Sequence, residues 1–191
     1  MAIIHHTTLK PTKLELLADW LPKQPWYQGS GAPELAKSGG FRLDDPAGEV
    51  GMEFMAVTDS SGPRPVTYHV PMTYRGAPLP DAPADALVGT LVHGVLGDRW
   101  VYDGTRDPVL LAQVTALLKG EVPAHAQSVD GELDGTVRAR IEDAAGEVRP
   151  EFVRLLDAGA DAPGARGEVS AEWSDGNGGR VRGVFVVVRG E

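Results

Sequence analysis

Residues 49–74 read EVGMEFMAVT-DSSGPRP-VTYHVPMTY. Apolar residues alternate with others on both sides of a central segment, 59–63, whose Asp, Ser, Gly and Pro residues favour turns. The alternating positions are Val50, Met52, Phe54 and Ala56 before the turn, and Val66, Tyr68, Val70 and Met72 after it. A period of two is the signature of a strand with one buried face. The stretch therefore predicts an antiparallel hairpin of strands 49–58 and 66–74.

Two helices are predicted from their end signals. Thr12 and Glu15 have the spacing of a capping box, and Pro22 ends the helix that follows. Asp107 is placed as the N-cap of the second helix, because a proline follows it at the first helical position. Gly120 is placed as its C-terminal stop.

Further strands lie on either side of the second helix. Residues 86–102 predict a second hairpin, and residues 168–189 predict a third around the turn DGNGG. Within the last strand, residues 184–188 read VFVVV, which predicts burial on both faces. Residues 137–141 predict a short strand, whereas 151–156 fit either a strand or one helical turn.

These elements predict an α+β protein with antiparallel sheets and two principal helices. Residues 121–135 are polar and marked by Gly and Pro, as in a linker. We therefore expect one domain over residues 1–125 and a smaller antiparallel β module over residues 126–191. The glycine-rich turn at 175–179 resembles a phosphate-binding loop, but a strand follows it rather than a helix, which favours a hairpin turn.

Composition excludes several classes of protein. The 191 residues contain no cysteine, so disulfides and cysteine-based zinc sites are excluded. The net charge of −9 disfavours nucleic-acid binding, because phosphate backbones would be repelled. No signal peptide and no apolar run of membrane-spanning length are visible, which predicts a cytoplasmic protein without a membrane partner. Metal binding is not expected from the histidines at positions 5, 6, 69, 93 and 125.

Two motifs stand out, WLPKQPWYQG at residues 20–29 and GDRWVYDG at residues 97–104, with YHVP at 68–71 between them. Their order resembles the N-terminal cap of maltokinases, kinases that phosphorylate maltose in actinobacterial α-glucan metabolism. In that family the first segment resembles the pattern W-L-x-x-Q-x-W-Y-x-G, and a Tyr-Asp pair precedes the second helix. The matching residues are Trp20, Leu21, Gln24, Trp26, Tyr27, Gly29, Tyr102 and Asp103, and Gly104, Asp107 and Pro108 continue the second segment into its helix. The resemblance covers roughly residues 13–120.

The resemblance implies a curved, cystatin-like antiparallel sheet with helices, followed in the family by a segment that leads into a kinase-like lobe. Residues 126–191 resemble a degenerate start of that segment, so we expect the lobe to be absent. A kinase needs a strand lysine for the phosphates, a catalytic aspartate and an acidic metal ligand. No lysine follows Lys119, and His93 precedes Gly94-Val95 rather than an aspartate. We expect no independent phosphoryl transfer, no catalytic residue, no cofactor and no metal site.

The aromatic residues of the two motifs are candidates for ligand binding. Trp26, Tyr27, Trp100 and Tyr102 could form a platform on which a sugar stacks, or could hold the helices to the sheet. Asp103 is included with them as a ligand-binding or partner-binding residue, although a turn or capping role explains it as well. Trp20, Gln24, Gly29, Gly104, Asp107 and Pro108 are expected to shape the motifs themselves.

Three functions follow from this reading. The first is a non-catalytic accessory or regulatory protein that binds a sugar kinase or another enzyme of α-glucan, maltose or trehalose metabolism. The second is a carbohydrate- or ATP-binding module. The third is a kinase-related protein that is active only with a partner.

Overall fold

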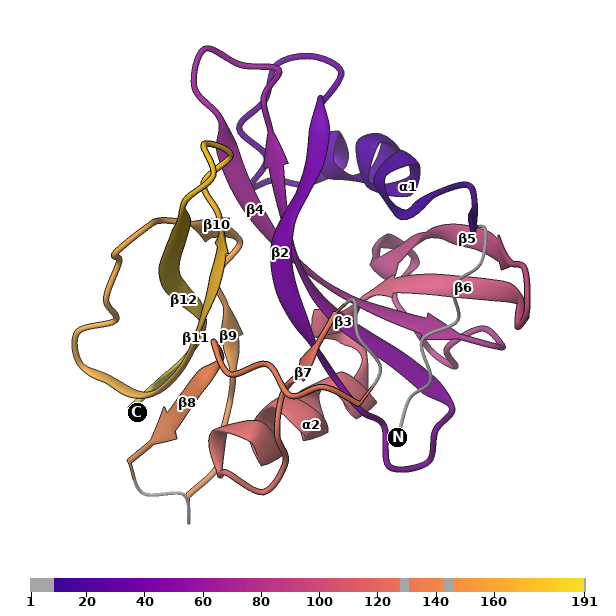
Figure 1. The fold of residues 1–191 in the computed structure, drawn as a ribbon. Coiled ribbons are helices and arrows are strands. Elements are labelled where there is room, and N and C mark those ends of the chain that lie inside the picture. The colour runs from indigo at the N-terminus through magenta and orange to yellow at the C-terminus, as the bar shows by residue number, and fades with distance from the viewer. Residues whose placement is uncertain (1–8, 128–130, 143–145, 191) are drawn as a thin grey trace.

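The computed structural model describes residues 9–127, 131–142 and 146–190, in which a large antiparallel sheet carries two α-helices (Figure 1). The strands run in the order β1-β5-β6-β4-β3-β2-β11-β12-β9, while β10 pairs with β4, β7 with β2 and β8 with β11. The sheet is curved and not closed, which confirms the predicted α+β class. The strands are β1 (Leu9–Lys10), β2 (Leu35–Leu43), β3 (Val50–Asp59), β4 (Val66–Arg75), β5 (Leu87–His93), β6 (Gly97–Asp103), β7 (His125–Ala126), β8 (Arg138–Ile141), β9 (Glu151–Phe152), β10 (Leu155–Leu156), β11 (Ala165–Ser174) and β12 (Arg180–Arg189). His5 and His6 lie outside the described residues.

Both helices begin at the predicted caps. Helix α1 (Lys13–Trp20) starts at Thr12, whose hydroxyl accepts from the Glu15 amide while the Glu15 carboxylate accepts from the Thr12 amide. A 3₁₀ turn, η1 (Leu21–Lys23), continues α1. Helix α2 (Pro108–Leu118) follows a second 3₁₀ turn, η3 (Gly104–Arg106), and the Asp107 side chain accepts from the Val109 amide. A third 3₁₀ turn, η2 (Ala84–Ala86), precedes β5.

The central sheet separates two hydrophobic cores. On β3, Phe54 and Ala56 face one core, and Met55 and Val57 alternate with them toward the other. Helix α1 covers the second of these cores with Leu17. Helix α2 and the C-terminal hairpin of β11 and β12 cover the first. The alternation read from residues 49–74 therefore describes a strand pair that is buried on both faces.

Side chains from both ends of the chain share the core on the α2 side. Phe41 stacks on Phe54 with ring centroids 4.5 Å apart, and Phe185 of β12 lies 5.8 Å from Phe41. Trp173 of β11 packs edge-on against Phe185 at 5.9 Å. The predicted division into two domains at residue 125 stays a prediction, but this core extends across it.

Residues 151–156 form strand pairings with two parts of the sheet. β9 pairs with β12, and β10 pairs with β4. Between them, the Val153 carbonyl accepts from Nδ1 of His69 at 3.0 Å, and the Arg154 carbonyl accepts from the His69 amide at 2.9 Å. The ambiguity of this segment is thus resolved as strand, and His69 is buried with a satisfied Nδ1.

The three predicted hairpins are confirmed, but one long strand was not predicted. β2 contains Gly39 and Gly40, and glycine has a low propensity for strands. In the structure Gly39 lies at a bulge in the β2–β3 ladder and pairs with Trp173 of β11. A side chain at Gly39 would crowd Trp173, because an added Cβ would lie 3.0 Å from the Trp173 Cα atom.

Candidate functional site

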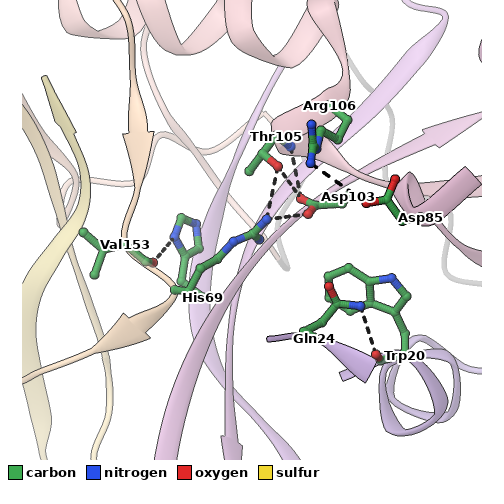
Figure 2. Close-up of polar contacts among 9 residues, drawn as sticks. Trp20, Gln24, His69, Asp85, Asp103, Thr105, Arg106 and Val153 are labelled. Atoms are coloured by element: carbon green, nitrogen blue, oxygen red, sulfur yellow. Dashed lines mark hydrogen bonds and ion pairs between the residues drawn. The ribbon is translucent and has the colours of Figure 1, made fainter. Parts of the chain in front are cut away.

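The turn after helix α1 is held together by the residues of the first motif. The Gln24 side chain donates to the Trp20 carbonyl at 3.2 Å, which fixes the chain as it leaves the helix (Figure 2). Trp26 then packs edge-on against Trp20, with ring centroids 5.8 Å apart. At Gly29 an added Cβ would lie 2.0 Å from the Tyr27 hydroxyl oxygen, so only glycine fits beside that ring. The motif is therefore a compact aromatic turn.

Tyr27 points into this turn rather than into solvent. Its ring lies 5.6 Å from that of Tyr68, and its hydroxyl donates to Asp59 at 2.8 Å. Desolvation, followed by the hydrogen bond to the Asp59 carboxylate, raises the pKa of Tyr27 to about 12. The Tyr27 hydroxyl is thus a neutral donor that anchors the turn to the end of β3.

The second motif turns the chain from β6 into helix α2. Asp103 accepts from the Thr105 amide at 3.1 Å, which starts η3. At Gly104 an added Cβ would lie 2.4 Å from Cδ1 of Leu110, so glycine allows the close contact with α2. Asp107 is fully buried and accepts two hydrogen bonds from Arg75, each 2.7 Å long. Burial by itself would raise the pKa of Asp107, but the hydrogen bonds of Arg75 and the Val109 amide hold it below the ordinary value.

A cleft of about 950 Å³ opens between this turn and residues 148–154. One side is formed by residues 24–26, and another by helix α2. Its volume falls at the upper end of the range found for small-molecule sites. The lining residues are Gln24, Pro25, Trp26, Asp85, Asp103, Thr105, Arg106, Leu111, Ala112, Thr115, Val148, Arg149, Pro150, Phe152 and Arg154.

Arg154 connects the walls of the cleft. Its Nη2 donates to Asp103 in a very short contact and to the Thr105 hydroxyl at 3.1 Å. Its guanidinium carbon lies 4.9 Å from the centroid of the Trp26 ring. The side chains of Arg154 and Asp103 are only 15% and 9% exposed. A partly desolvated ion pair and a cation–π contact therefore join the C-terminal segment to the two motifs.

The five predicted binding residues do not gather at one place. Trp26 and Asp103 line the cleft. Trp100 and Tyr102 alternate on β6 with Val101, which belongs to the core that Trp26 packs against, so they face the opposite side of the sheet. The Tyr102 hydroxyl accepts from the Leu79 amide at 3.0 Å and holds the loop after β4. Ligand contact by these residues stays a prediction, but the structure does not assemble them into one aromatic platform.

The sequence did not single out Arg106, Arg149, Phe152 or Arg154. Arg106 follows the second motif by two residues, whereas Arg149, Phe152 and Arg154 lie in or beside the segment whose type was ambiguous. Only the pairing of β9 and β10 brings residues 151–156 beside the motifs. The dipeptide Val153-Arg154 carries no pattern of its own. Only a prediction that β10 pairs with β4 could have placed Arg154 beside the motifs.

A buried carboxylate forms a separate charged cluster on the α1 side. Glu53 accepts from Lys13 at 2.5 Å, from the Tyr74 hydroxyl at 2.8 Å and from Gln127 at 3.0 Å, and Lys37 lies 3.9 Å away. Burial would raise the pKa of Glu53, but the attraction and hydrogen bond of Lys13 outweigh it and hold the pKa below the ordinary value. Glu53 is therefore ionised, and it joins α1, β2, β3 and β4.

The hairpin of β5 and β6 exposes an apolar surface. Leu87, Val92, Val95 and Leu96 are four of the five large apolar side chains that are exposed among the described residues, and Leu133 is the fifth. Val95 at the tip is 61% exposed and Val92 is 53% exposed. We call these four side chains the hairpin patch. Within the described residues, the short strand β1 pairs with β5 at Val92 and His93.

Comparison with known families identifies the part of the chain that carries both motifs. Residues 20–107 match the family model described as the maltokinase N-terminal cap domain. Over these residues the chain is similar to that domain, and we refer to residues 20–107 as the cap domain. The cap domain begins at Trp20 of the aromatic turn and ends at Asp107, the N-cap of α2. This confirms the resemblance drawn from the two motifs over somewhat less than half of the chain.

The cleft lies where the cap domain meets the rest of the chain. The cap domain supplies Trp26, Asp103 and Arg106, whereas α2 and residues 148–154 supply the other walls. A comparison with curated proteins finds no match. In the described part of the chain, no group of three or more metal-ligating side chains is found, and no helix has the length and apolar character of a membrane span.

Proposed function

We propose that this chain is a non-catalytic accessory protein that acts by binding another protein. The partner that we propose is a cytoplasmic sugar kinase or another enzyme of α-glucan, maltose or trehalose metabolism. The cap domain supports this choice of partner, because it is a module of maltokinases. The hairpin patch carries the proposal of a protein-binding role.

Single exposed apolar side chains are normal on protein surfaces, whereas a group of them marks an interaction site. In the hairpin patch, Val92, Val95 and Leu96 lie at or next to the turn between β5 and β6, whereas Leu87 lies at the other end of β5. Burying such side chains at an interface removes apolar area from water, which favours association.

The proposal is tested by affinity capture from a lysate of the organism that encodes the chain. The double variant Val95→Asp, Leu96→Asp places charges in the hairpin patch without touching a buried residue. Leu133→Asp is the matched control, because Leu133 is 59% exposed and lies outside the hairpin. We expect wild type and the control to enrich a sugar kinase or a glucan or trehalose enzyme, identified by mass spectrometry, and the double variant to lose it. Enrichment of no such enzyme, or equal enrichment by the double variant, would contradict the proposal.

The cleft favours a second candidate function, the binding of a small molecule such as a saccharide or Mg-ATP. Its volume suits such ligands, and Trp26 and Phe152 offer aromatic surface beside polar groups. Melting temperatures measured with maltose, maltooligosaccharides and Mg-ATP test this candidate, because a ligand that binds only the folded state must raise stability. Unchanged melting temperatures at millimolar ligand would exclude it.

A further inference from the structure

The lining of the cleft reverses the charge balance of the protein. The chain as a whole carries a net charge of −9. The cleft is lined by three arginines, Arg106, Arg149 and Arg154, and by two aspartates, Asp85 and Asp103. Each of these arginines pairs with a carboxylate, but the Nη1 atom of Arg154 is buried and has no hydrogen-bond partner among the described residues. Because a buried guanidinium nitrogen is normally hydrogen-bonded, the unpartnered Nη1 of Arg154 points to an acceptor such as an anionic ligand.

The carboxylate on the cleft wall is already neutralised. Asp103 is engaged by Arg154 and by the Thr105 amide and hydroxyl, and it is almost fully buried. The repulsion that Asp103 would exert on an incoming anion is thus compensated within the protein. Because Asp103, Thr105 and the Trp26 ring fix the Arg154 side chain, its charge is held beside the cleft without further ordering.

The other two arginines form exposed ion pairs. Arg106 lies 4.0 Å from Asp85, with side chains 54% and 78% exposed, and Figure 2 shows this pair beside Asp103. Arg149 pairs with Glu147 in an equally exposed setting. Exposed ion pairs contribute little because water screens them. A ligand phosphate can compete with these carboxylates, because it accepts bidentate hydrogen bonds from guanidinium groups.

The remaining walls are apolar and partly aromatic. Pro25, Trp26, Leu111, Pro150 and Phe152 all line the cleft. A free inorganic ion would leave this apolar surface exposed to water, whereas the ring of a larger ligand would cover it. Resting on the second candidate function, we propose that the cleft binds a small molecule in which a phosphoryl group, held by the arginines, is attached to a ring-shaped body that packs on Trp26 and Phe152.

Isothermal titration calorimetry on the full chain with glucose 6-phosphate, glucose and inorganic phosphate tests this inference. We expect glucose 6-phosphate to bind more tightly than either of the others, and its binding to weaken as NaCl rises from about 50 to 500 mM, because the arginine–phosphate attraction is screened. Arg106→Gln and Arg149→Gln should each weaken binding roughly tenfold, the loss expected when one charge-assisted hydrogen bond is removed. Arg180→Gln is the matched control, since Arg180 is 58% exposed, pairs with Glu172 and lies outside the cleft.

Each outcome separates this inference from the functions above. Equal affinity for glucose and glucose 6-phosphate would overturn the phosphoryl assignment but leave saccharide binding in place. If inorganic phosphate bound as tightly as glucose 6-phosphate, the proposed packing of a ring-shaped body on Trp26 and Phe152 would be contradicted. An equal loss of affinity in Arg180→Gln would show that the ligand responds to the charge of the whole protein, and would contradict a binding site in the cleft. The hairpin variant Val95→Asp, Leu96→Asp should bind glucose 6-phosphate normally, because the hairpin patch does not line the cleft.

Discussion

Lowering the pH from 7 to 5 should destabilise the fold through His69. This imidazole is fully buried, and its Nδ1 donates to the Val153 carbonyl. Desolvation, with repulsion from the nearby Arg154, lowers the pKa of His69 from 6.5 to about 3. The unfolded chain therefore binds a proton below pH 6.5, whereas the folded chain stays neutral there until about pH 3. Because the unfolded state binds more protons in this window, stability falls as the pH falls.

The magnitude follows from the width of the window. Each pH unit below 6.5 removes about 1.4 kcal/mol until the folded pKa is reached, so the loss at pH 5 is about 2 kcal/mol. The buried carboxylates do not contribute in this range. Burial opposes the charge of Glu53 and Asp107, but hydrogen bonds and ion pairs outweigh it and lower their pKa values, so their share of stability is lost only as the pH falls below the ordinary carboxylate values.

The assay is urea unfolding at pH 7, 6 and 5, followed by tryptophan fluorescence, for wild type and His69→Gln. We expect the free energy of unfolding of wild type to fall by about 2 kcal/mol and that of the variant to change much less. The comparison uses slopes against pH, so a general destabilisation by the substitution does not affect it. Nuclear magnetic resonance of wild type gives a second readout, in which the His69 ring should keep its neutral form at pH 5. An equal slope in both proteins, or a native His69 that titrates near pH 6.5, would refute the reasoning.

Three further substitutions test the packing of the cap domain and helix α1, each by urea unfolding at pH 7. Lys13→Met should cost about 1.5–3 kcal/mol, because it removes the charge-assisted hydrogen bond to the buried Glu53, and an unchanged midpoint would contradict that pairing. Gly104→Ala should cost about 1–3 kcal/mol, because the new methyl group would lie 2.4 Å from Leu110, and a neutral effect would mean that α2 shifts freely. Thr12→Ala should cost about 1 kcal/mol by removing the N-cap of α1, whereas Thr12→Ser should not.

The local parts of the fold could be predicted from the sequence, because local chemistry fixes them. Thr12 with Glu15 and Asp107 with its following proline mark both helix starts, and a period of two marks the hairpin at residues 49–74. The long strand β2 was not predicted, because its glycines do not favour a strand. Its stability comes from pairing with β3 and β11 on either side.

The cleft could be predicted only in part. Trp26 and Asp103, which the motifs singled out, both line the cleft, and both belong to turns that the sequence marks. Trp100 and Tyr102 were grouped with Trp26 by their chemistry, whereas alternation along β6 turns them to the other face. The position of Arg154 at the cleft depends on the pairing of β10 with β4, which are more than eighty residues apart in the sequence. The sequence carries no local signal for this pairing.

The central claim, that this chain acts by binding and not by phosphoryl transfer, is tested most directly by measuring ADP release. The purified chain is incubated with Mg-ATP and maltose, with glucose and with glucosamine, and ADP is followed in a coupled assay. The account predicts no release above that of controls without sugar. Saturable ADP release that requires both ATP and a sugar would contradict it.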